Sequence, residues 1–280
     1  MNITLPDGSI RKLESGSTGL DLANSIGPGL AKAAIAVEVN GSQKDLCDPI
    51  MDDSEVSIIT IDSKEGLEIM RHTLTAQVLA RAVKNLYPDT KLAIGPTITD
   101  GFYYDFEFKK PISTEDLEAI EKEMKKVIAT NSSIIKSLHS REDAIKVFKS
   151  EKEPYKESII EDSDQEDNFQ LYYQEDSKFV DLCRGPHLPN LKHIGSFKLT
   201  KLAGAYWKGD SKNKMLTRIY GTAWKNDKDL NGYLHSIEEA EKRDHRKLGK
   251  EMDLFHFQEE APGMVFWHPN GWTIYRNLRN

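Results

Sequence analysis

The seven residues from 181 to 187 bring a carboxylate, a thiol, a guanidinium and an imidazole into one short run. The Gly185-Pro186 pair inside this run predicts a turn rather than a helix. A strand that ends at Leu182 before this turn would direct the Cys183 thiol and the His187 imidazole into one space. Hydrolysis and metal binding both need such groups to converge, so we predict a chemical site here.

Three kinds of chemistry are open to a site built from these residue types. A histidine beside a cysteine can lower the pKa of the thiol and make a nucleophile pair. Two histidines and a cysteine could hold zinc, with water as the fourth ligand. The same groups could instead position a water molecule and a substrate ester, without a metal or a covalent intermediate. The candidate groups are His72, Tyr104, Lys156, Asp181, Cys183 and His187. Their spacing does not decide among the three.

The composition indicates a soluble, globular protein. Of the 280 residues, 30% are charged and 38% are hydrophobic, which is typical of a folded chain rather than a disordered one. No apolar run approaches the roughly 20 residues that span a bilayer, and the N-terminus lacks a signal-peptide pattern. Cys47 and Cys183 lie far apart, and two such thiols favour a reducing compartment. We therefore expect a cytoplasmic protein without a membrane partner.

The charge is distributed unevenly along the chain. The formal net charge is −7, which argues against a general nucleic-acid coat. Segment 184–228, however, has ten Lys or Arg residues against two Asp residues, which leaves a local charge of +8. A basic surface of this kind can meet phosphates even on an acidic protein. The competing interpretation is a solvated lysine face.

Residues 1–61 predict a small domain with a β-grasp, ubiquitin-like order of elements. Two short strands flank the turn Pro6-Asp7-Gly8, a short helix stops at Gly27-Pro28-Gly29, and two β-branched runs follow. The expected elements are strands at 1–5 and 9–13, a helix at 18–26, and strands at 34–39 and 56–61.

After residue 63 the pattern indicates an α+β domain with a mainly antiparallel sheet. The expected helices are 67–86, 113–130 and 140–149, and the expected strands lie near 102–108, 169–173, 178–182, 196–201 and 215–220. Residues 228–252 then predict one long polar helix, of the kind that often bridges domains. Two strands, at 252–257 and 263–267, and the start of a helix, at 272–278, are expected after it. These elements are too few to complete another core.

Six long runs carry a resemblance to a known family. They are "LAIGPTITDGFYYD" at 92–105, "FVDLCRGPH" at 179–187, "GAYWKGD" at 204–210, "RIYGTAW" at 218–224, "EKRDHRKL" at 241–248 and "DLFHFQEEAPGMVFW" at 253–267. In these runs the whole chain resembles the bacterial threonyl-tRNA synthetases. The resemblance implies a TGS domain at 1–61, an editing domain shared with alanyl-tRNA synthetases at 63–225, a linker helix at 226–243, and the incomplete beginning of a class II catalytic domain at 244–280.

The resemblance also implies a function, the proofreading of seryl-tRNA(Thr) by hydrolysis. A synthetic site for threonine also admits serine, because the missing methyl changes binding by only about 1–3 kcal/mol. By position, the implied catalytic residues are His72, Lys156, Asp181, Cys183 and His187, and the implied substrate-binding residues are Tyr104, Gln77 and Arg184. His72 or Lys156 would activate water, and Asp181 would bind the substrate amine.

One departure from the family pattern concerns the helix that carries His72. The family has His-x3-His at this place, whereas Ala76 stands four residues after His72 and Gln77 five residues after it. Five residues of an α-helix turn about 500°, so the two side chains would not share a face. We therefore expect no metal ligands in this site and a weakened but real hydrolysis. The alternative is a tRNA-binding module with a degraded, inactive site.

The resemblance limits the cofactors and partners that we expect for this chain. ATP, magnesium and zinc would belong to the catalytic domain beyond Asn280, so no cofactor is expected here. The expected partners are tRNA(Thr) and the seryl or threonyl group that it carries. The full-length enzyme is expected to be a homodimer, and this part of it could be a monomer. A free-standing editing protein is disfavoured, because the sequence stops inside a half-built domain.

Overall fold

The computed structural model describes residues 1–279, which form two compact units, the first of them ending at Asp227. The first unit holds two domains: one cluster of buried apolar residues lies within the first domain, and a larger cluster lies mainly in the second domain and also includes Ile35, Ala36 and Ile59 of the first. No helix within residues 1–279 has both the length and the apolar character needed to cross a bilayer.

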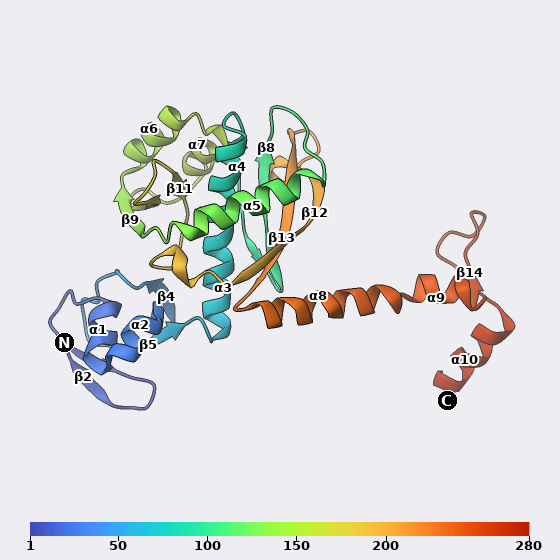
Figure 1. Cartoon of the computed structure of the whole chain (residues 1–280), viewed down its shortest axis with the longest axis horizontal. Helices are drawn as coiled ribbons and strands as arrows, with labels where there is room; N and C mark the ends of the chain where they lie inside the picture. Colours follow the sequence, from blue (N-terminus) through green and yellow to red (C-terminus); the bar gives the residue numbers. More distant parts are fainter. Residues whose placement is uncertain (280) are drawn as a thin grey trace. The chain divides into compact units, whose positions relative to one another are not determined.

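The first domain is a five-stranded sheet with two short helices packed against it (Figure 1). Its elements are β1 (Asn2–Thr4), β2 (Ile10–Lys12), α1 (Gly19–Ile26), α2 (Pro28–Ala33), β3 (Ala34–Val39), β4 (Ser42–Asp45) and β5 (Ser54–Thr60). The strand order is β2-β1-β5-β3-β4, and only the β1–β5 pair is parallel. A capping box between Thr18 and Asp21 starts α1, whose Leu22 is fully buried. The predicted β-grasp order is confirmed, with α2 and the edge strand β4 added to it.

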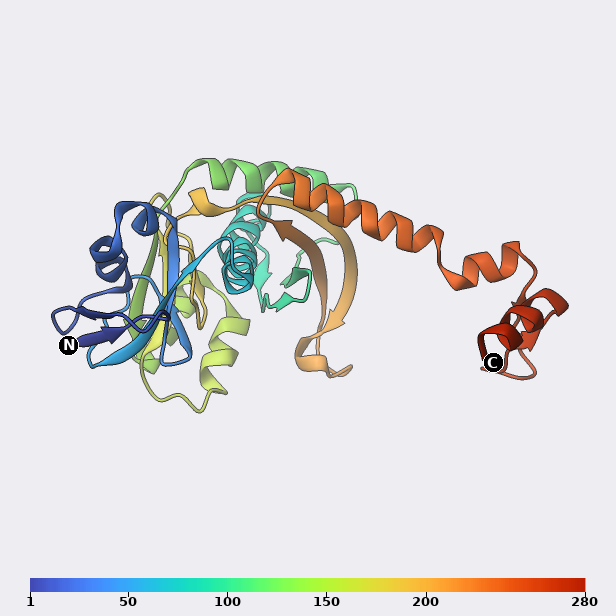
Figure 2. The same cartoon turned by 90° about the horizontal axis from the view of Figure 1, so that it is seen from below.

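The second domain has an antiparallel sheet in the order β12-β13-β8-β6, and β7 also pairs with β8. The strands are β6 (Lys91–Leu92), β7 (Thr97–Ile98), β8 (Gly101–Glu107), β12 (Ser196–Tyr206) and β13 (Met215–Trp224). Phe102, Tyr104 and Phe106 of β8 are fully buried in the core that this sheet shares with α5 (Asp116–Ala129) and the helix after residue 63. Figure 2 shows β12 and β13 as one long curved hairpin.

A smaller antiparallel sheet supplies the other wall of the second domain. It consists of β9 (Ile134–His139), β10 (Phe169–Gln174) and β11 (Val180–Leu182), with β10 in the middle. Helices α6 (Arg141–Glu151) and α7 (Pro154–Glu161) connect β9 to β10. As predicted, a strand ends at Leu182, directly before the turn that carries Cys183. The mixed α+β class with antiparallel sheets is confirmed.

The helix expected over 67–86 is one continuous helical segment with a wide turn in its middle. It consists of α3 (Lys64–Thr73), the π-helical segment η1 (Leu74–Leu79) and α4 (Ala80–Leu86). The N–H of Ala80 donates to the carbonyl of Thr75, five residues back. A π turn accommodates one more residue than an α turn and is frequent at functional sites. Gln77 lies within this π-helical segment.

The second unit begins after Asp227 and contains mostly helix. Its elements are α8 (Asp227–Lys242), α9 (His245–Glu251), β14 (Phe255–His256), β15 (Phe266–Trp267) and α10 (Pro269–Arg279). The prediction of one helix over 228–252 is wrong, because the helix ends at Lys242 and restarts at His245. The Asp244 side chain accepts a hydrogen bond from the Arg246 N–H and caps α9. A side chain that caps a new helix competes with continuation of the old one.

Candidate active site

A cavity of about 790 Å³ lies where α3, η1, β8, α7 and β11 of the second domain meet. Six of the residues predicted from the sequence line it: His72, Tyr104, Lys156, Asp181, Cys183 and Arg184. They come from four separate elements and the turn after β11, and His72 and Cys183 are 111 positions apart in the sequence. The fold therefore brings these six predicted residues together, although they come from distant parts of the sequence.

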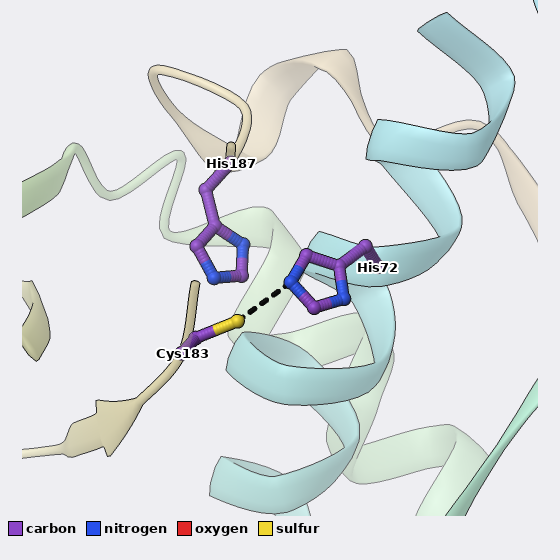
Figure 3. A group of neighbouring side chains, drawn as sticks. All are labelled: His72, Cys183 and His187. Carbon is purple, nitrogen blue, oxygen red and sulfur yellow. Dashed lines mark hydrogen bonds between the residues drawn. The ribbon is translucent and has the colours of Figure 1, made fainter. Parts of the chain in front are cut away.

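His72 and Cys183 are in direct contact at the cavity wall (Figure 3). The Nε2 atom of His72 lies 2.6 Å from the Sγ atom of Cys183. Burial lowers the pKa of the His72 imidazole from its ordinary value of 6.5, and the Asp181 and Asp45 carboxylates oppose this effect. An imidazole with a lowered pKa is neutral at neutral pH, so it can accept a proton from water or from a thiol.

His187 stands behind His72 and does not line the cavity. The two imidazole rings are stacked, with centroids 4.6 Å apart and planes 14° apart. The Nδ1 atom of His187 lies 3.1 Å from the hydroxyl of Thr73, which also accepts the N–H of Leu188. The Nε2 atom of His187 is buried and has no hydrogen-bond partner within residues 1–279. His187 is therefore placed to fix the orientation of His72.

Lys156 and Asp181 form a buried ion pair in the cavity wall. The Nζ atom of Lys156 lies 2.6 Å from Oδ1 of Asp181, and the two side chains are only 4% and 2% exposed. The N–H of Leu182 donates to the same carboxylate, and the Tyr104 hydroxyl donates to it over 3.4 Å. Burial raises the pKa of the Asp181 carboxyl, while the Lys156 ammonium acts to lower it. The pair as a whole is neutral, and it places both the Lys156 ammonium and the Asp181 carboxylate on the cavity wall.

Local structure explains why Lys156 points into the cavity. Helix α7 begins at Pro154, whose ring suits the first helical position, so Lys156 stands in the first turn. The Glu153 carboxylate before it accepts hydrogen bonds from Lys84 and from the N–H of Leu92. These contacts join the start of α7 to α4 and β6, and they hold Lys156 in place.

Gln77, like His187, is a predicted site residue that does not line the cavity. It is fully buried in η1, and its carbonyl and its side-chain oxygen both accept hydrogen bonds from the Gln174 amide. Ala76 lines the cavity in its place. Arg184 lines the cavity and is exposed, as a substrate-binding group would be. The roles of these residues stay predictions.

Several residues around the site escaped the sequence analysis. Tyr172 pairs with Asp181 in the β10–β11 ladder, and its ring meets the edge of His187 with centroids 4.3 Å apart. Lys208, at the tip of the β12–β13 hairpin, lines the cavity and forms an ion pair with Asp162, which follows α7 and also lines the cavity. A strand pattern around 169–173 could have suggested Tyr172. Lys208 was part of the predicted basic segment 184–228, but its position at this cavity was not predicted.

The Cys183, His72 and His187 side chains offer the atoms of a three-ligand metal site. One potential ligand atom from each lies within 4.8 Å of the others. Zinc bonds of about 2.3 Å to sulfur and 2.0 Å to nitrogen in a tetrahedral site hold two ligands roughly 3.5 Å apart. The 2.6 Å contact between His72 and Cys183 is shorter than that, so the two atoms stand as a hydrogen-bonded pair. The expectation of a metal-free site stays a prediction.

Comparisons with known proteins identify the class of this chain. The family model for the TGS domain matches residues 1–60, which form the β-grasp domain. The family model described as "Threonyl and Alanyl tRNA synthetase second additional domain" matches residues 170–220, which include Asp181, Cys183 and His187. The chain thus combines two domains found in aminoacyl-tRNA synthetases.

Comparison with a curated relative shows to which synthetase family the chain belongs. The chain is 54% identical over 276 residues, or 99% of its length, to the threonine–tRNA ligase of Prochlorococcus marinus (strain MIT 9211). It spans 43% of the length of that relative. The protein is a homologue of threonine–tRNA ligase that contains a TGS domain and a second additional domain of the synthetase type.

Proposed function

We propose that the cavity of the second additional domain hydrolyses mischarged seryl-tRNA(Thr). The observation that carries this proposal is the convergence of His72, Lys156, Asp181 and Cys183 on one cavity. For cleavage of an aminoacyl ester, a neutral imidazole can act as the base and a buried ammonium can stabilise the negative charge that develops on the carbonyl oxygen.

In the proposed reaction a water molecule attacks the carbonyl carbon of the ester. His72 accepts the proton of the water, and the ammonium of Lys156 stabilises the negative charge that develops on the carbonyl oxygen. The bond between the carbonyl carbon and the ribose oxygen then breaks. His72 returns the proton to that oxygen, so the products are serine and a tRNA with a free terminal hydroxyl.

Cys183 offers a second route through a covalent thioester. The Nε2 atom of His72 lies 2.6 Å from the Cys183 sulfur, so a base stands directly beside the thiol. His72 is needed in either route, because the thioester must also be hydrolysed by activated water. Replacing Cys183 with alanine separates the routes: hydrolysis persists if water attacks the ester directly and is lost if the thiol does.

The proposed partner of the basic segment 184–228 is the tRNA. Five of its basic residues form ion pairs with acidic residues elsewhere in the chain: Lys198 with Glu121, Lys208 with Asp162, Lys214 with Glu107, Arg218 with Asp105, and Lys225 with Asp62. Much of the local charge is therefore compensated. Arg184, exposed beside the cavity, is the basic residue best placed to bind the phosphates of the tRNA end.

The deciding experiment compares hydrolysis of seryl-tRNA(Thr) and threonyl-tRNA(Thr) by this chain, with buffer alone as the reference. We expect seryl-tRNA to be hydrolysed faster by roughly 10- to 200-fold, the range over which one methyl group can discriminate. Binding of uncharged tRNA(Thr) is measured in parallel. Bound tRNA with hydrolysis no faster than in buffer would favour the alternative, a tRNA-binding module with an inactive site.

A chelator tests the expectation that the site works without a metal. Because His72 and Cys183 are in hydrogen-bonding contact, we expect dialysis against EDTA to leave the rate of seryl-tRNA hydrolysis unchanged. The control is metal analysis of the dialysed protein, which confirms that any bound zinc has been removed. A loss of activity that returns with added zinc would show that the three side chains hold a metal.

The activity of the whole protein is also a proposal, because this chain spans only part of its relative. We propose that the whole protein attaches threonine to tRNA(Thr) with ATP in the cytoplasm, as a homodimer, and that the cavity described above corrects its errors with serine. Support comes from the 54% identity to a threonine–tRNA ligase.

A further inference from the structure

Asp45 belongs to the TGS domain, yet its side chain lies among residues of the second additional domain. It is the last residue of the edge strand β4, it stands 142 positions before His187, and it is only 5% exposed. A carboxylate taken out of water destabilises the fold unless donors surround it. The hydrogen-bond donors around the Asp45 carboxylate therefore indicate which part of the structure this residue holds in place.

Three donors from the second additional domain surround the Asp45 carboxylate. The backbone N–H of His187 donates to Oδ1 over 2.8 Å. The Tyr172 hydroxyl and the Lys136 ammonium donate to Oδ2 over 2.7 and 3.0 Å. Burial and the nearby Asp45 carboxylate raise the pKa of Tyr172 well above its ordinary value, so its hydroxyl stays protonated and can donate.

These contacts hold the turn that carries Cys183 and His187. Asp45 binds the backbone of His187 and also Tyr172, whose ring packs against the edge of His187. The turn fits closely against this pair, since a Cβ atom at Gly185 would lie 2.1 Å from the Tyr172 hydroxyl and 3.1 Å from Oδ2 of Asp45. The His187 ring in turn stacks on His72, so the arrangement extends from the TGS domain to the cavity.

We propose that Asp45 is a positioning residue for the hydrolytic site, through which the TGS domain holds the Cys183–His187 turn against His72. The proposal rests on the hydrolysis of seryl-tRNA proposed above. It makes the site a composite of two domains, in which the second additional domain supplies the reacting groups and the TGS domain fixes one wall.

Asp48 provides a matched control within the same turn. Its carboxylate binds Lys136 over 2.7 and 2.8 Å and accepts the N–H of Asp45. Within residues 1–279 its carboxylate forms no hydrogen bond with His187 or Tyr172, which are the two groups that Asp45 holds. A general weakening of the contact between the domains should therefore appear in both Asp48→Ala and Asp45→Ala, whereas loss of positioning should appear in Asp45→Ala alone.

The first test is the rate of seryl-tRNA hydrolysis by the full chain. We expect Asp45→Ala to lower kcat at least about tenfold, because small displacements of a catalytic group reduce rates strongly. KM should stay within about twofold, because Asp45 does not line the cavity. Asp45→Asn retains an acceptor for the His187 N–H and should recover part of kcat. Equal kcat values for Asp45→Ala and Asp48→Ala would overturn the proposal.

The second test does not depend on activity. Hydrogen exchange at the His187 amide is followed by NMR or by mass spectrometry of the peptide that contains it. We expect Asp45→Ala to accelerate this exchange at least about tenfold, and Asp48→Ala to leave it near the native rate. Unchanged exchange in Asp45→Ala would overturn the anchoring. A native chain that fails to hydrolyse seryl-tRNA would instead remove the proposed function, and the exchange rates would still decide whether Asp45 holds the turn.

Discussion

Replacing His72 with alanine is expected to lower kcat for seryl-tRNA hydrolysis by about 10²- to 10⁴-fold, the usual contribution of a general base. The imidazole lines the cavity, contacts Cys183 and has a pKa lowered by burial. Alanine removes the only imidazole on the cavity wall within residues 1–279, and with it the proton acceptor proposed for the water. KM should change little, because the base acts on the water rather than on the bound ester.

The matched control for this variant is His193→Ala. His193 is a second histidine whose pKa burial lowers, but it lies in the short helix η2 (Leu191–His193) and does not line the cavity. Its replacement should leave kcat unchanged. The kcat of the native chain should also persist below pH 6.5, since His72 remains in its base form until the pH falls to its lowered pKa. Equal activity in His72→Ala and the native chain would exclude His72 as the base.

Local sequence was sufficient to predict the parts of the fold that depend on short-range patterns. The turn Pro6-Asp7-Gly8, the helix stop at Gly27-Pro28-Gly29 and the β-branched runs led to the β-grasp order that the structure confirms. The strand that ends at Leu182 was predicted for the same reason, because Gly185-Pro186 prevents a helix after it. These signals act within a few residues, so they are visible without a structure.

Contacts between distant residues could not be predicted in this way. Nothing near Asp45 in the sequence shows that its carboxylate binds a backbone group 142 positions away. The contact of Gln77 with Gln174 was also hidden, although the sequence indicated that Gln77 would not share a face with His72, because the π turn in η1 forms where packing and hydrogen bonds across the domain favour it rather than where a local motif requires it. An angle calculated for a regular α-helix therefore does not describe the segment from His72 to Gln77.

Replacing Lys156 with methionine is expected to affect both stability and catalysis. The variant leaves the Asp181 carboxylate buried without its cation, in a pair whose side chains are 4% and 2% exposed in the native chain. Removing one partner of such a pair lowers the free energy of unfolding by about 3–5 kcal/mol. Loss of the ammonium beside the cavity should also lower kcat for seryl-tRNA hydrolysis by about 10²- to 10³-fold. Chemical denaturation and single-turnover hydrolysis measure the two effects.

A double variant separates the two roles of Lys156. In Lys156→Met/Asp181→Asn no charge is left unpaired, and the amide can still accept the Leu182 N–H, so we expect most of the lost free energy of unfolding to return while kcat stays low. Lys109→Met breaks an ion pair with Asp89 whose side chains are 74% and 70% exposed, and should change stability by less than about 1 kcal/mol. Recovery of kcat together with stability in the double variant would mean that Lys156 serves the fold alone. Continued loss of kcat in a stable protein would place the Lys156–Asp181 pair in the reaction.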